Sequence, residues 1–364
     1  MRTKLIFTGG FLGAGKTTLL QQAAAFLTAK GKLVGLITND QAEDLVDTHF
    51  LSSKNEWVKE LSGSCFCCNY DGFLGLLNSL MEQGKTLDLI IAEPVGSCTD
   101  ISATILQPLK QHMTQVVDMA PFTVLADPYK LEEILDGGDA GMHPATAYIY
   151  RRQLEEADLI LISKTDIIDD HRLRLLKEKL ALAHPQQDVL TISATEGTGL
   201  EEWIEYLYQN KNSGSRIAQV DYDIYAEGEA ALGWLNASVM VEGTGVDWNQ
   251  FLRAYFIKLN DLLGVETSIG HIKIWLEAVN GNYITGNQTG LASTLQFRGD
   301  AGTGNFAGMT INARVEADPE RLKEIVFTAM ARSIRKDMFY KIRQCRALKP
   351  GYPRPQYHYR QVVN

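Results

Sequence analysis

Residues 10–17, Gly-Phe-Leu-Gly-Ala-Gly-Lys-Thr, constrain this chain more than any other stretch. They follow a short apolar run at residues 5–7 and open into a helix-compatible segment that starts at Thr18. Strand, glycine loop and helix in this order are typical of the phosphate-binding loop G-x-x-x-x-G-K-[ST]. Glycine lets the backbone approach phosphate oxygens closely, and the N–H groups at the start of the helix face the anion. The pattern predicts binding of a nucleoside triphosphate.

Individual atoms of this loop have expected roles. Lys16 would reach the β- and γ-phosphates and support phosphoryl transfer, while the Thr17 hydroxyl would bind Mg²⁺. The other loop residues that we expect to bind the nucleotide are Gly10, Gly13, Ala14, Gly15 and Thr18. A glycine-rich turn before a helix can arise by chance, but here strand, Lys-Thr pair and helix all occur together.

The first 210 residues alternate between short apolar runs and longer helical patterns. The runs rich in Val, Ile and Leu are residues 4–8, 33–38, 87–92, 122–126, 159–162 and 189–192. Such alternation predicts an α/β fold with a mostly parallel sheet and helices on both faces. Ligands of these sheets bind beyond the carboxyl ends of the strands. The polar residues that follow the runs should therefore meet at one edge.

The character of the sequence changes after a polar, turn-forming stretch at residues 210–215. We expect a P-loop domain over residues 1–210, a linker over 211–224 and a smaller α+β domain over 225–364. The smaller domain should contain a largely antiparallel sheet and two helices, and no catalytic motif occurs in it. Its expected strands are residues 233–241, 269–278, 283–285, 291–297 and 308–315, and its expected helices are residues 248–263 and 319–338. A docking or regulatory role would suit it.

Composition excludes several classes of partner. The 364 residues carry a formal charge of −9, which argues against nucleic acid or an anionic membrane. No stretch approaches the roughly 18 apolar residues of a transmembrane helix. No charged-then-apolar leader precedes the first strand signal, so we expect a cytoplasmic protein.

Two segments bear on the identity of the base. Ser163-Lys164-Thr165-Asp166 follows a buried run and approximates the guanine-reading pattern Asn-Lys-x-Asp. The Asp166 carboxylate would accept from guanine N1–H and N2–H₂, and the stem of Lys164 would lie over the base. Near residue 193, Ser193-Ala194 resembles the loop whose backbone N–H meets guanine O6. Lys-Thr-Asp is also a plausible helix entry, but the two signals in this order favour guanine over adenine.

Two carboxylates are candidates for Mg²⁺ binding and hydrolysis. Glu93 ends a buried run beside the phosphate loop, where it could hold Mg²⁺ or orient the attacking water. Gly96, three residues on, could turn its N–H toward the γ-phosphate. Asp40 is the matching candidate in the other nucleotide-sensing loop, although Asn-Asp also simply favours turns.

Cys65, Cys67 and Cys68 lie within four residues of one another. Thiolates are ligands of Zn²⁺ and similar soft ions. We expect Cys65 and Cys67 on one side of an extended segment and a turn at Cys68 that brings the third sulfur round. The fourth position would be taken by water or by a side chain such as His49 or Glu60. Buried free thiols and a redox pair are the alternatives. Cys98 and Cys345 stand alone in the sequence, His143, His271 and His358 are scattered singly, and we expect all five to be structural or surface residues.

Residues 10–17, the Cys-x-Cys-Cys cluster, Glu93 with Gly96, and Lys164 with Asp166 together resemble the CobW-type GTPases. These are P-loop metal chaperones grouped with the nickel-insertion GTPases of urease and hydrogenase. The resemblance implies GTP, Mg²⁺ and a bound Zn²⁺ or Co²⁺, which is delivered to a client metalloenzyme or a cobalamin-related protein. A nucleotide-dependent homodimer is a further partner to consider.

The sequence thus predicts a GTP-hydrolysing metallochaperone, with Lys16, Glu93 and Asp40 in the catalytic role. A P-loop kinase or ATPase is one alternative, and it would prefer ATP and work without the cysteines. A nucleotide-gated scaffold for a cobalamin or metal enzyme is another, and its client binding would survive loss of Cys65, Cys67 and Cys68.

Overall fold

The structure is a computed structural model that describes residues 2–39, 46, 51, 57–82, 86–264, 267–290 and 295–363. Contacts divide the chain into two compact units. The first, here called the N-terminal unit, comprises Met1–Gln41, Leu51–Gly228 and the returning C-terminal segment Tyr352–Asn364. The C-terminal unit comprises Ala42–Phe50 and Glu229–Gly351.

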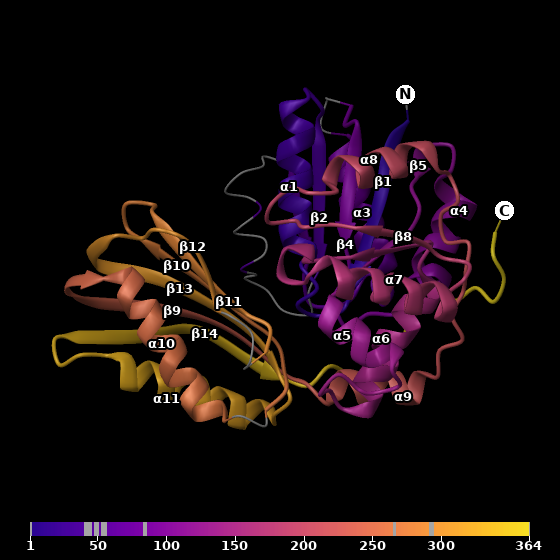
Figure 1. Ribbon diagram of the computed structural model, residues 1–364. Helices are drawn as coiled ribbons and strands as arrows, with labels where there is room; N and C mark the ends of the chain where they lie inside the picture. Colours follow the sequence, from indigo (N-terminus) through magenta and orange to yellow (C-terminus); the bar gives the residue numbers. More distant parts are fainter. Residues whose placement is uncertain are drawn as a thin grey trace. The chain divides into compact units, whose positions relative to one another are not determined.

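The N-terminal unit is built on a parallel sheet with helices on both faces (Figure 1), which confirms the predicted fold class. In the described residues its order is β3-β2-β4-β1-β6-β7-β8, with β5 also paired to β1. The strands are β1 (Thr3–Gly10), β2 (Val34–Asn39), β3 (Val58–Leu61), β4 (Leu89–Glu93), β5 (Val117–Met119), β6 (Thr123–Ala126), β7 (Leu159–Ile162) and β8 (Asp188–Thr191). The helices are α1 (Lys16–Ala29), α3 (Tyr70–Met81), α4 (Gln107–Met113), α5 (Pro128–Leu135), α6 (Pro144–Glu156), α7 (Asp170–Ala183), α8 (Leu200–Gln209) and α9 (Tyr222–Ala230), with a π-helical turn η1 (Ser102–Leu106) and a 3₁₀ turn η2 (Thr165–Ile167).

Burial on both faces explains the apolar strands. Every residue of β4 and β7 is buried, including Glu93 at the end of β4. Strand β1 pairs with β4 on one side and β6 on the other, so it lies in the middle of the sheet. The phosphate loop therefore leaves the sheet at its centre, where the edge collects the ends of several strands.

Two strands of this sheet are absent from the sequence prediction. β3 (Val-Lys-Glu-Leu) carries two charged residues and lies at the edge, next to β2 only. β5 has only three residues. Neither has the long apolar run by which a central strand is found in a sequence.

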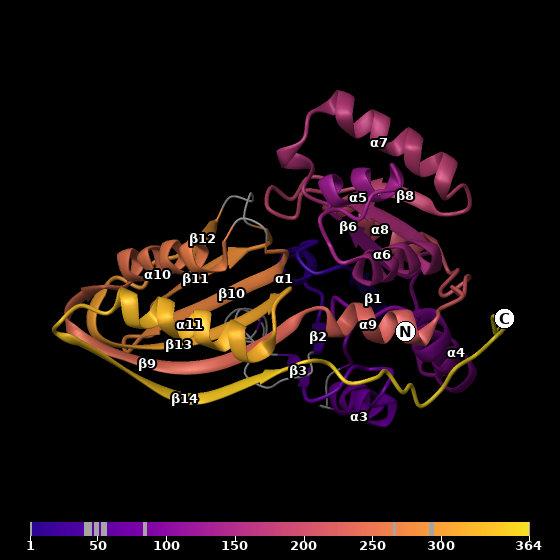
Figure 2. The ribbon, with the colours of Figure 1, turned by 90° about the horizontal axis from the view of Figure 1, so that it is seen from below.

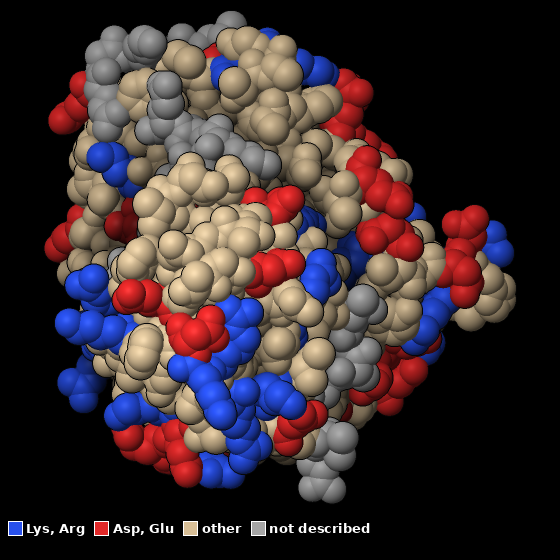
Figure 3. Space-filling view, turned by 90° about the vertical axis from the view of Figure 1, so that its left-hand side faces the viewer, with Lys and Arg blue, Asp and Glu red and all other residues tan. Residues whose placement is uncertain are grey.

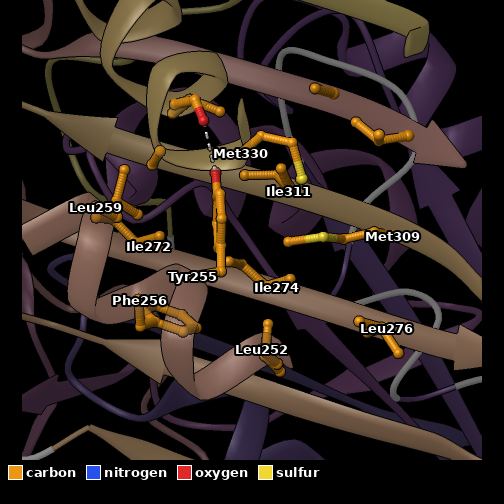
Figure 4. Close-up of a cluster of buried hydrophobic side chains, with 14 of the residues drawn as sticks. Leu252, Tyr255, Phe256, Leu259, Ile272, Ile274, Leu276, Met309, Ile311 and Met330 are labelled. Atoms are coloured by element: carbon orange, nitrogen blue, oxygen red, sulfur yellow. Dashed lines mark hydrogen bonds between the residues drawn. The ribbon is translucent and has the colours of Figure 1, made fainter. Parts of the chain in front are cut away.

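The C-terminal unit contains an antiparallel sheet with the order β12-β11-β10-β13-β9-β14 in the described residues. Its elements are β9 (Gly233–Asp247), α10 (Trp248–Leu263), β10 (Ile269–Ala278), β11 (Tyr283–Gln288), β12 (Gln296–Gly299), β13 (Thr303–Val315), α11 (Pro319–Ser333) and β14 (Met338–Leu348). Both helices lie on one face of the sheet (Figures 1 and 2). Figure 4 shows the core between these helices and the sheet, in which the Tyr255 hydroxyl donates to the carbonyl oxygen of Val326 at 3.1 Å.

The end of this unit differs from the prediction of a helix over residues 319–338. Helix α11 ends at Ser333, and the chain is already extended at Ile334. Residues 338–348 form the edge strand β14, and much of their surface is exposed. The predicted strand at 291–297 is observed only from Gln296, because residues 291–294 lie outside the described residues.

Charged side chains dominate the exposed edge of this sheet. Lys341, Arg343 and Arg346 of β14 are exposed, and such residues discourage an edge strand from pairing with another chain. On the face shown in Figure 3, Lys and Arg side chains gather in one region with Asp and Glu around them. No helix in the part of the chain that the structure describes is long and apolar enough to cross a membrane.

Candidate nucleotide and metal site

The phosphate loop adopts a conformation that requires glycine. The φ angles of Gly10, Gly13 and Gly15 are 127°, 82° and 97°. A Cβ on Gly10 would lie 2.4 Å from the carbonyl oxygen of Leu125, so a side chain there is excluded by sterics as well as by torsion. Gly15 is the N-cap of α1, which aims the start of the helix at the loop.

Lys16 folds back over this loop. Its Nζ donates to the carbonyl oxygens of Gly10 at 2.7 Å and Phe11 at 3.3 Å. The side chain is 6% exposed, and a buried ammonium is stabilised by such contacts. A phosphate in the loop would offer this ammonium a charged partner in place of neutral carbonyls.

Thr17 and Glu93 meet at the beginning of α1. The Thr17 hydroxyl donates to both carboxylate oxygens of Glu93, at 3.2 Å each. Both side chains are 7% exposed. A hydroxyl and a carboxylate beside a phosphate loop are hard oxygen donors, so the pair fits the requirements of Mg²⁺. Predicted from separate motifs, the two residues are brought together by the pairing of β1 with β4.

Gly96 approaches the same loop with its backbone. A Cβ on this residue would lie 2.9 Å from Lys16 Nζ and 3.2 Å from the backbone nitrogen of Leu12. The carbonyl oxygen of Gly96 accepts from Gln153 Nε2 of α6 at 3.1 Å. The segment after β4 therefore lies against the phosphate loop, and its contact with a γ-phosphate remains a prediction. Asp40, the other predicted carboxylate, lies outside the described residues.

Asn39, the last residue of β2, holds the cysteine loop. Its Nδ2 donates to the carbonyl oxygens of Leu61 at 2.9 Å and Ser64 at 2.7 Å, and its Oδ1 accepts from Phe66 N–H at 2.9 Å. Sequence analysis did not assign this role. A polar amide directly after a buried strand is the signal that could have indicated it, because a buried amide must be fully hydrogen-bonded.

The three cysteines converge, and the turn expected at Cys68 is present but begins earlier, at residue 66, so the segment from Cys65 to Cys67 is not extended. Residues 66–69 form a turn closed by a hydrogen bond from Cys68 N–H to the Cys65 carbonyl at 3.1 Å. Cys65 and Cys67 Sγ are 3.0 Å apart, and Cys67 and Cys68 Sγ 3.8 Å. Within the described residues, they are the group of metal-binding side chains whose ligand atoms all lie within 4.8 Å of one another.

One of these two sulfur–sulfur distances matches a tetrahedral thiophilic ion. With Zn–S bonds of about 2.3 Å, a tetrahedral site has S–S edges of about 3.8 Å, which the Cys67–Cys68 pair already has. The Cys65–Cys67 pair, at 3.0 Å, would have to open to this distance. Of the two suggested fourth ligands, His49 lies outside the described residues, and Glu60 does not belong to the close group.

The Cys67 and Cys68 thiols are protonated at neutral pH when no metal is bound. Hydrogen bonds with Cys65, Cys68 and Cys98 raise the pKa of the Cys67 thiol well above its usual range. Hydrogen bonding to Cys65 raises the pKa of Cys68 to about 11, with burial adding to the effect. Metal binding must release these protons, so it strengthens as pH rises.

The two predicted base-reading segments are joined to each other. Asp166 Oδ1 accepts from the Ser193 hydroxyl at 2.6 Å, and the same hydroxyl accepts from Glu196 N–H at 3.2 Å. Thr165 N–H donates to the carbonyl oxygen of Ile192 at 3.3 Å. Ala194, next to Ser193, is 9% exposed. The predicted pair of guanine-reading segments thus forms one surface at the ends of β7 and β8.

Lys164 adopts the left-handed conformation, with φ 53°, and pairs with Asp127 at 2.8 Å. Burial opposes ionisation of Asp127, but Lys164 and Lys130 together more than offset it and hold the pKa of this carboxyl below its usual range. Asp127 also caps α5 by accepting from Tyr129 N–H and Lys130 N–H. The ion pair fixes the lysine stem beside the predicted base site.

Lys130 is a second lysine near the phosphate loop, and sequence analysis missed it. Its Nζ donates to the carbonyl oxygen of Leu12 at 3.3 Å and lies 5.3 Å from the centre of the Phe11 ring. Burial lowers the pKa of this ammonium to about 8. Lys130 therefore links α5 to the phosphate loop through this hydrogen bond.

The C-terminal segment returns to the N-terminal unit and covers the cysteine loop. Arg354 N–H donates to Cys68 Sγ at 3.3 Å, and Gln356 N–H donates to the carbonyl oxygen of Cys67 at 2.9 Å. The Tyr357 ring packs edge-on against Tyr70 at 5.0 Å. Figure 2 shows this segment running past α3 and α4 to the chain end. Its Pro-rich, polar sequence gives no periodic signal by which such packing could be predicted.

Two buried carboxyl groups lie beside this segment. Asp100 has φ 65°, is fully buried, accepts from the Tyr222 hydroxyl at 2.6 Å and pairs with His358 at 3.0 Å. Burial raises the pKa of Asp100 to about 6 and that of Glu156 to about 8. Glu156 accepts from the Thr99 hydroxyl at 3.0 Å. The scattered His358 is therefore part of a defined polar cluster.

A parallel sheet with a phosphate loop leaving its central strand and a Thr-Glu pair behind that loop define a P-loop nucleotide-binding protein. Residues 4–191 match the nucleotide-binding domain of CobW/HypB/UreG, and the chain belongs to this family. The resemblance predicted from the motifs is confirmed.

Curated relatives carry the name zinc chaperone. The zinc chaperone CobW of Sinorhizobium sp is 29% identical over 191 residues, which cover 47% of this chain and 53% of the relative. The zinc chaperone YjiA of Escherichia coli (strain K12) is 28% identical over 192 residues, 50% of this chain and 55% of the relative. The chain spans about half the length of these relatives. Among solved structures, HypB from Helicobacter pylori in complex with nickel is 20% identical, with a TM-score of 0.41 over 60% of this chain and 91% of that one.

Proposed function

We propose that this protein is a GTP-hydrolysing metallochaperone. Its nucleotide state would control how tightly it holds a thiophilic divalent ion, Zn²⁺ or Co²⁺, which it delivers to a client metalloprotein. One observation carries the proposal. The Asn39 amide joins the end of β2, at the edge where the phosphate loop leaves the sheet, to the loop that carries three converging thiols.

The nucleotide would be held by the residues predicted from the motifs. Loop N–H groups from Gly13 to Thr18 bind the phosphates, and Lys16 leaves the loop carbonyls to pair with them. Asp166 and Lys164 read guanine, with Ser193 and Ala194 lining the same surface. Thr17 and Glu93 would hold Mg²⁺, which would supply positive charge beside the phosphates. Because phosphoryl transfer is catalysed mainly by positioning the reactants and neutralising their charge, we expect GTP hydrolysis by the protein alone to be slow.

The metal cargo would be held by Cys65, Cys67 and Cys68. Zinc is favoured because the matched relatives are named zinc chaperones and because thiolates suit it. Cobalt and a cobalamin-related client are the second choice of cargo and client. The C-terminal unit, which has its own sheet and core, is the proposed docking element for the client.

The coupling between nucleotide state and zinc affinity is tested by titrating Zn²⁺ against a competing chelator in the presence of GDP or a non-hydrolysable GTP analogue. Typical coupling energies predict affinities that differ by about 5–150-fold, and zinc must change the affinity for GTP by the same factor. The variant with Cys65, Cys67 and Cys68 replaced by Ser should lose zinc but keep GTP. Cys345→Ser, in the C-terminal unit, is the matched control.

Three results would contradict the proposal. Equal zinc affinities in both nucleotide states would remove the coupling. Tighter binding of ATP than of GTP would favour a P-loop kinase or ATPase. Client binding that is unchanged in the triple Ser variant would favour a scaffold.

A further inference from the structure

Two lysine ammonium groups bind three consecutive carbonyl oxygens of the phosphate loop. Lys16 Nζ donates to the carbonyl oxygens of Gly10 and Phe11. Lys130 Nζ donates to the next one, that of Leu12, at 3.3 Å. The two lysines are attached differently, because Lys16 directly follows the loop that it binds, whereas Lys130 reaches the loop from helix α5.

The first turn of α5 fixes the place from which the Lys130 side chain extends. Asp127 caps this turn by accepting from Tyr129 N–H and Lys130 N–H, and its other carboxylate oxygen pairs with Lys164 at 2.8 Å. The Lys130 side chain is partly buried, and its ammonium lies 5.3 Å from the centre of the Phe11 ring. One helical turn therefore connects the predicted base-reading surface to the phosphate loop.

The Leu12 carbonyl belongs to the same peptide group as the Gly13 N–H. No cis peptide bond occurs in the part of the chain that the structure describes, so this N–H points away from the Leu12 oxygen and from Lys130. Gly13 is one of the residues that we expect to bind the phosphates. An ammonium on the oxygen of a peptide group polarises that group, which makes its N–H a stronger donor to an anion.

We propose that Lys130 is a second lysine of the phosphate loop, a positioning residue that holds and polarises the Leu12–Gly13 peptide for the nucleotide. This inference rests on the nucleotide binding that is part of the proposed function. When Lys16 leaves the loop carbonyls for the phosphates, Lys130 remains on the Leu12 carbonyl. The loop then keeps one of its two contacts with a cation while the phosphates are bound.

The charge of Lys130 can be titrated. Burial lowers the pKa of its ammonium to about 8, Asp127 opposes this effect, and Lys164 and Lys16 add to it. Tyr150 of α6 also faces Asp127, and burial raises the pKa of its hydroxyl well above the usual range, so it stays neutral. Bound phosphates favour the charged lysine. Nucleotide binding should therefore weaken as pH rises through 8 and Lys130 releases its proton to solvent.

The affinity for a non-hydrolysable GTP analogue with Mg²⁺ tests this role. Lys130→Met removes the charge and the donor, and we expect the affinity at neutral pH to fall by about 10–100-fold, the effect of a hydrogen bond to a charged group. Lys130→Arg keeps a donor and stays charged at high pH. Lys177→Met, which changes an exposed lysine of α7, is the matched control and should bind like wild type.

The pH profile separates positioning from a merely structural role. It is measured from pH 7 to 9, one unit on either side of the Lys130 pKa. Across this range wild type should lose up to about 10-fold in affinity relative to Lys130→Arg, because only about a tenth of a group with this pKa is protonated at the upper end. Lys130→Met should not show this loss. Comparison between variants removes the titration of the nucleotide itself.

The outcomes distinguish this inference from the proposed function. Wild-type affinity in Lys130→Met would overturn the role of Lys130 and leave the metallochaperone intact, as would a weakened variant whose pH profile still follows wild type. Wild type that binds no GTP analogue would overturn both. Circular dichroism shows whether the variants fold. If Lys130→Met does not, wild type and Lys130→Arg decide, and equal profiles exclude Lys130. If Lys130→Arg does not, the comparison with Lys130→Met decides.

Discussion

The side-chain amide of Asn39 donates a 2.7 Å hydrogen bond to the carbonyl oxygen of Ser64, so the last residue of β2 holds the residue before the first cysteine. The same side chain accepts from Phe66 N–H, on the other side of Cys65. A single buried amide thus fixes the backbone around the Cys65 thiol. It does so from the strand that runs into the predicted first nucleotide-sensing loop.

Asn39→Ala should separate metal binding from nucleotide state. The substitution removes three hydrogen bonds from the cysteine loop without touching the phosphate loop. We expect zinc affinity to fall by about 10–100-fold, as for other outer partners of metal ligands, and its dependence on GTP to disappear. Chelator competition with and without a GTP analogue measures both effects. Undiminished dependence on GTP would show that Asn39 is not the connection.

Glu93→Gln should slow hydrolysis while the nucleotide still binds. The amide keeps the shape of the carboxylate but loses the charge next to Thr17. We expect the hydrolysis rate to fall by about 100-fold or more if Glu93 orients water or Mg²⁺. Phosphate release and binding of a fluorescent GTP analogue give the two readouts. Thr17→Ser, which keeps the hydroxyl, serves as the control, and a normal rate in Glu93→Gln would remove this residue from catalysis.

Asp166→Asn should change base preference. A carboxylate accepts from both guanine donors, whereas an amide presents one donor and one acceptor. The variant should lose GTP affinity by about 10–100-fold and gain affinity for xanthosine triphosphate, whose O2 accepts where guanine donates. Competition between the two nucleotides measures the switch. A variant that retains the GTP preference of wild type would place the base elsewhere.

Glu156→Gln should flatten the dependence of stability on pH. Burial raises the pKa of Glu156 from its ordinary 4.5 to about 8 in the folded protein. The stabilisation from its neutral form is complete below the unfolded pKa and is lost as pH rises toward the folded pKa. Glu156→Gln should therefore become progressively more stable relative to wild type between pH 5 and 8, a range that follows from these two values. Scanning calorimetry measures the unfolding temperature of both proteins at each pH. The transition that moves to higher temperature when GTP is added is the unfolding of the N-terminal unit. Parallel curves would contradict a neutral Glu156.

Gln356→Pro should weaken metal binding more than Gln356→Ala. Proline removes the N–H that donates to the Cys67 carbonyl, whereas alanine removes only the side-chain contact with Asp71. We expect faster zinc loss to a chelator in the proline variant, with GTP binding unchanged in both. Equal rates of zinc loss would show that the C-terminal segment does not support the site.

Features that depend on one short segment of the sequence could be predicted from it. The phosphate loop, the apolar strands and the cysteine cluster each depend on local torsion, burial or spacing, so they could be predicted. Strand β14 could not, because an exposed edge strand with alternating charges has no apolar run. The contact of the Asn39 side chain with the cysteine loop was missed for another reason. It depends on which strands pair, and β2 and β3 lie side by side only once the sheet forms.

The returning C-terminal segment has a mechanical consequence. Strand β14 ends at Leu348 in the C-terminal unit, and six residues later Arg354 touches the sulfur of Cys68. Six residues of extended chain span at most about 20 Å, so this is the greatest distance that can separate the two positions. A force on β14 that would stretch the connection beyond this reach would pull the backbone at Arg354 away from the Cys68 sulfur.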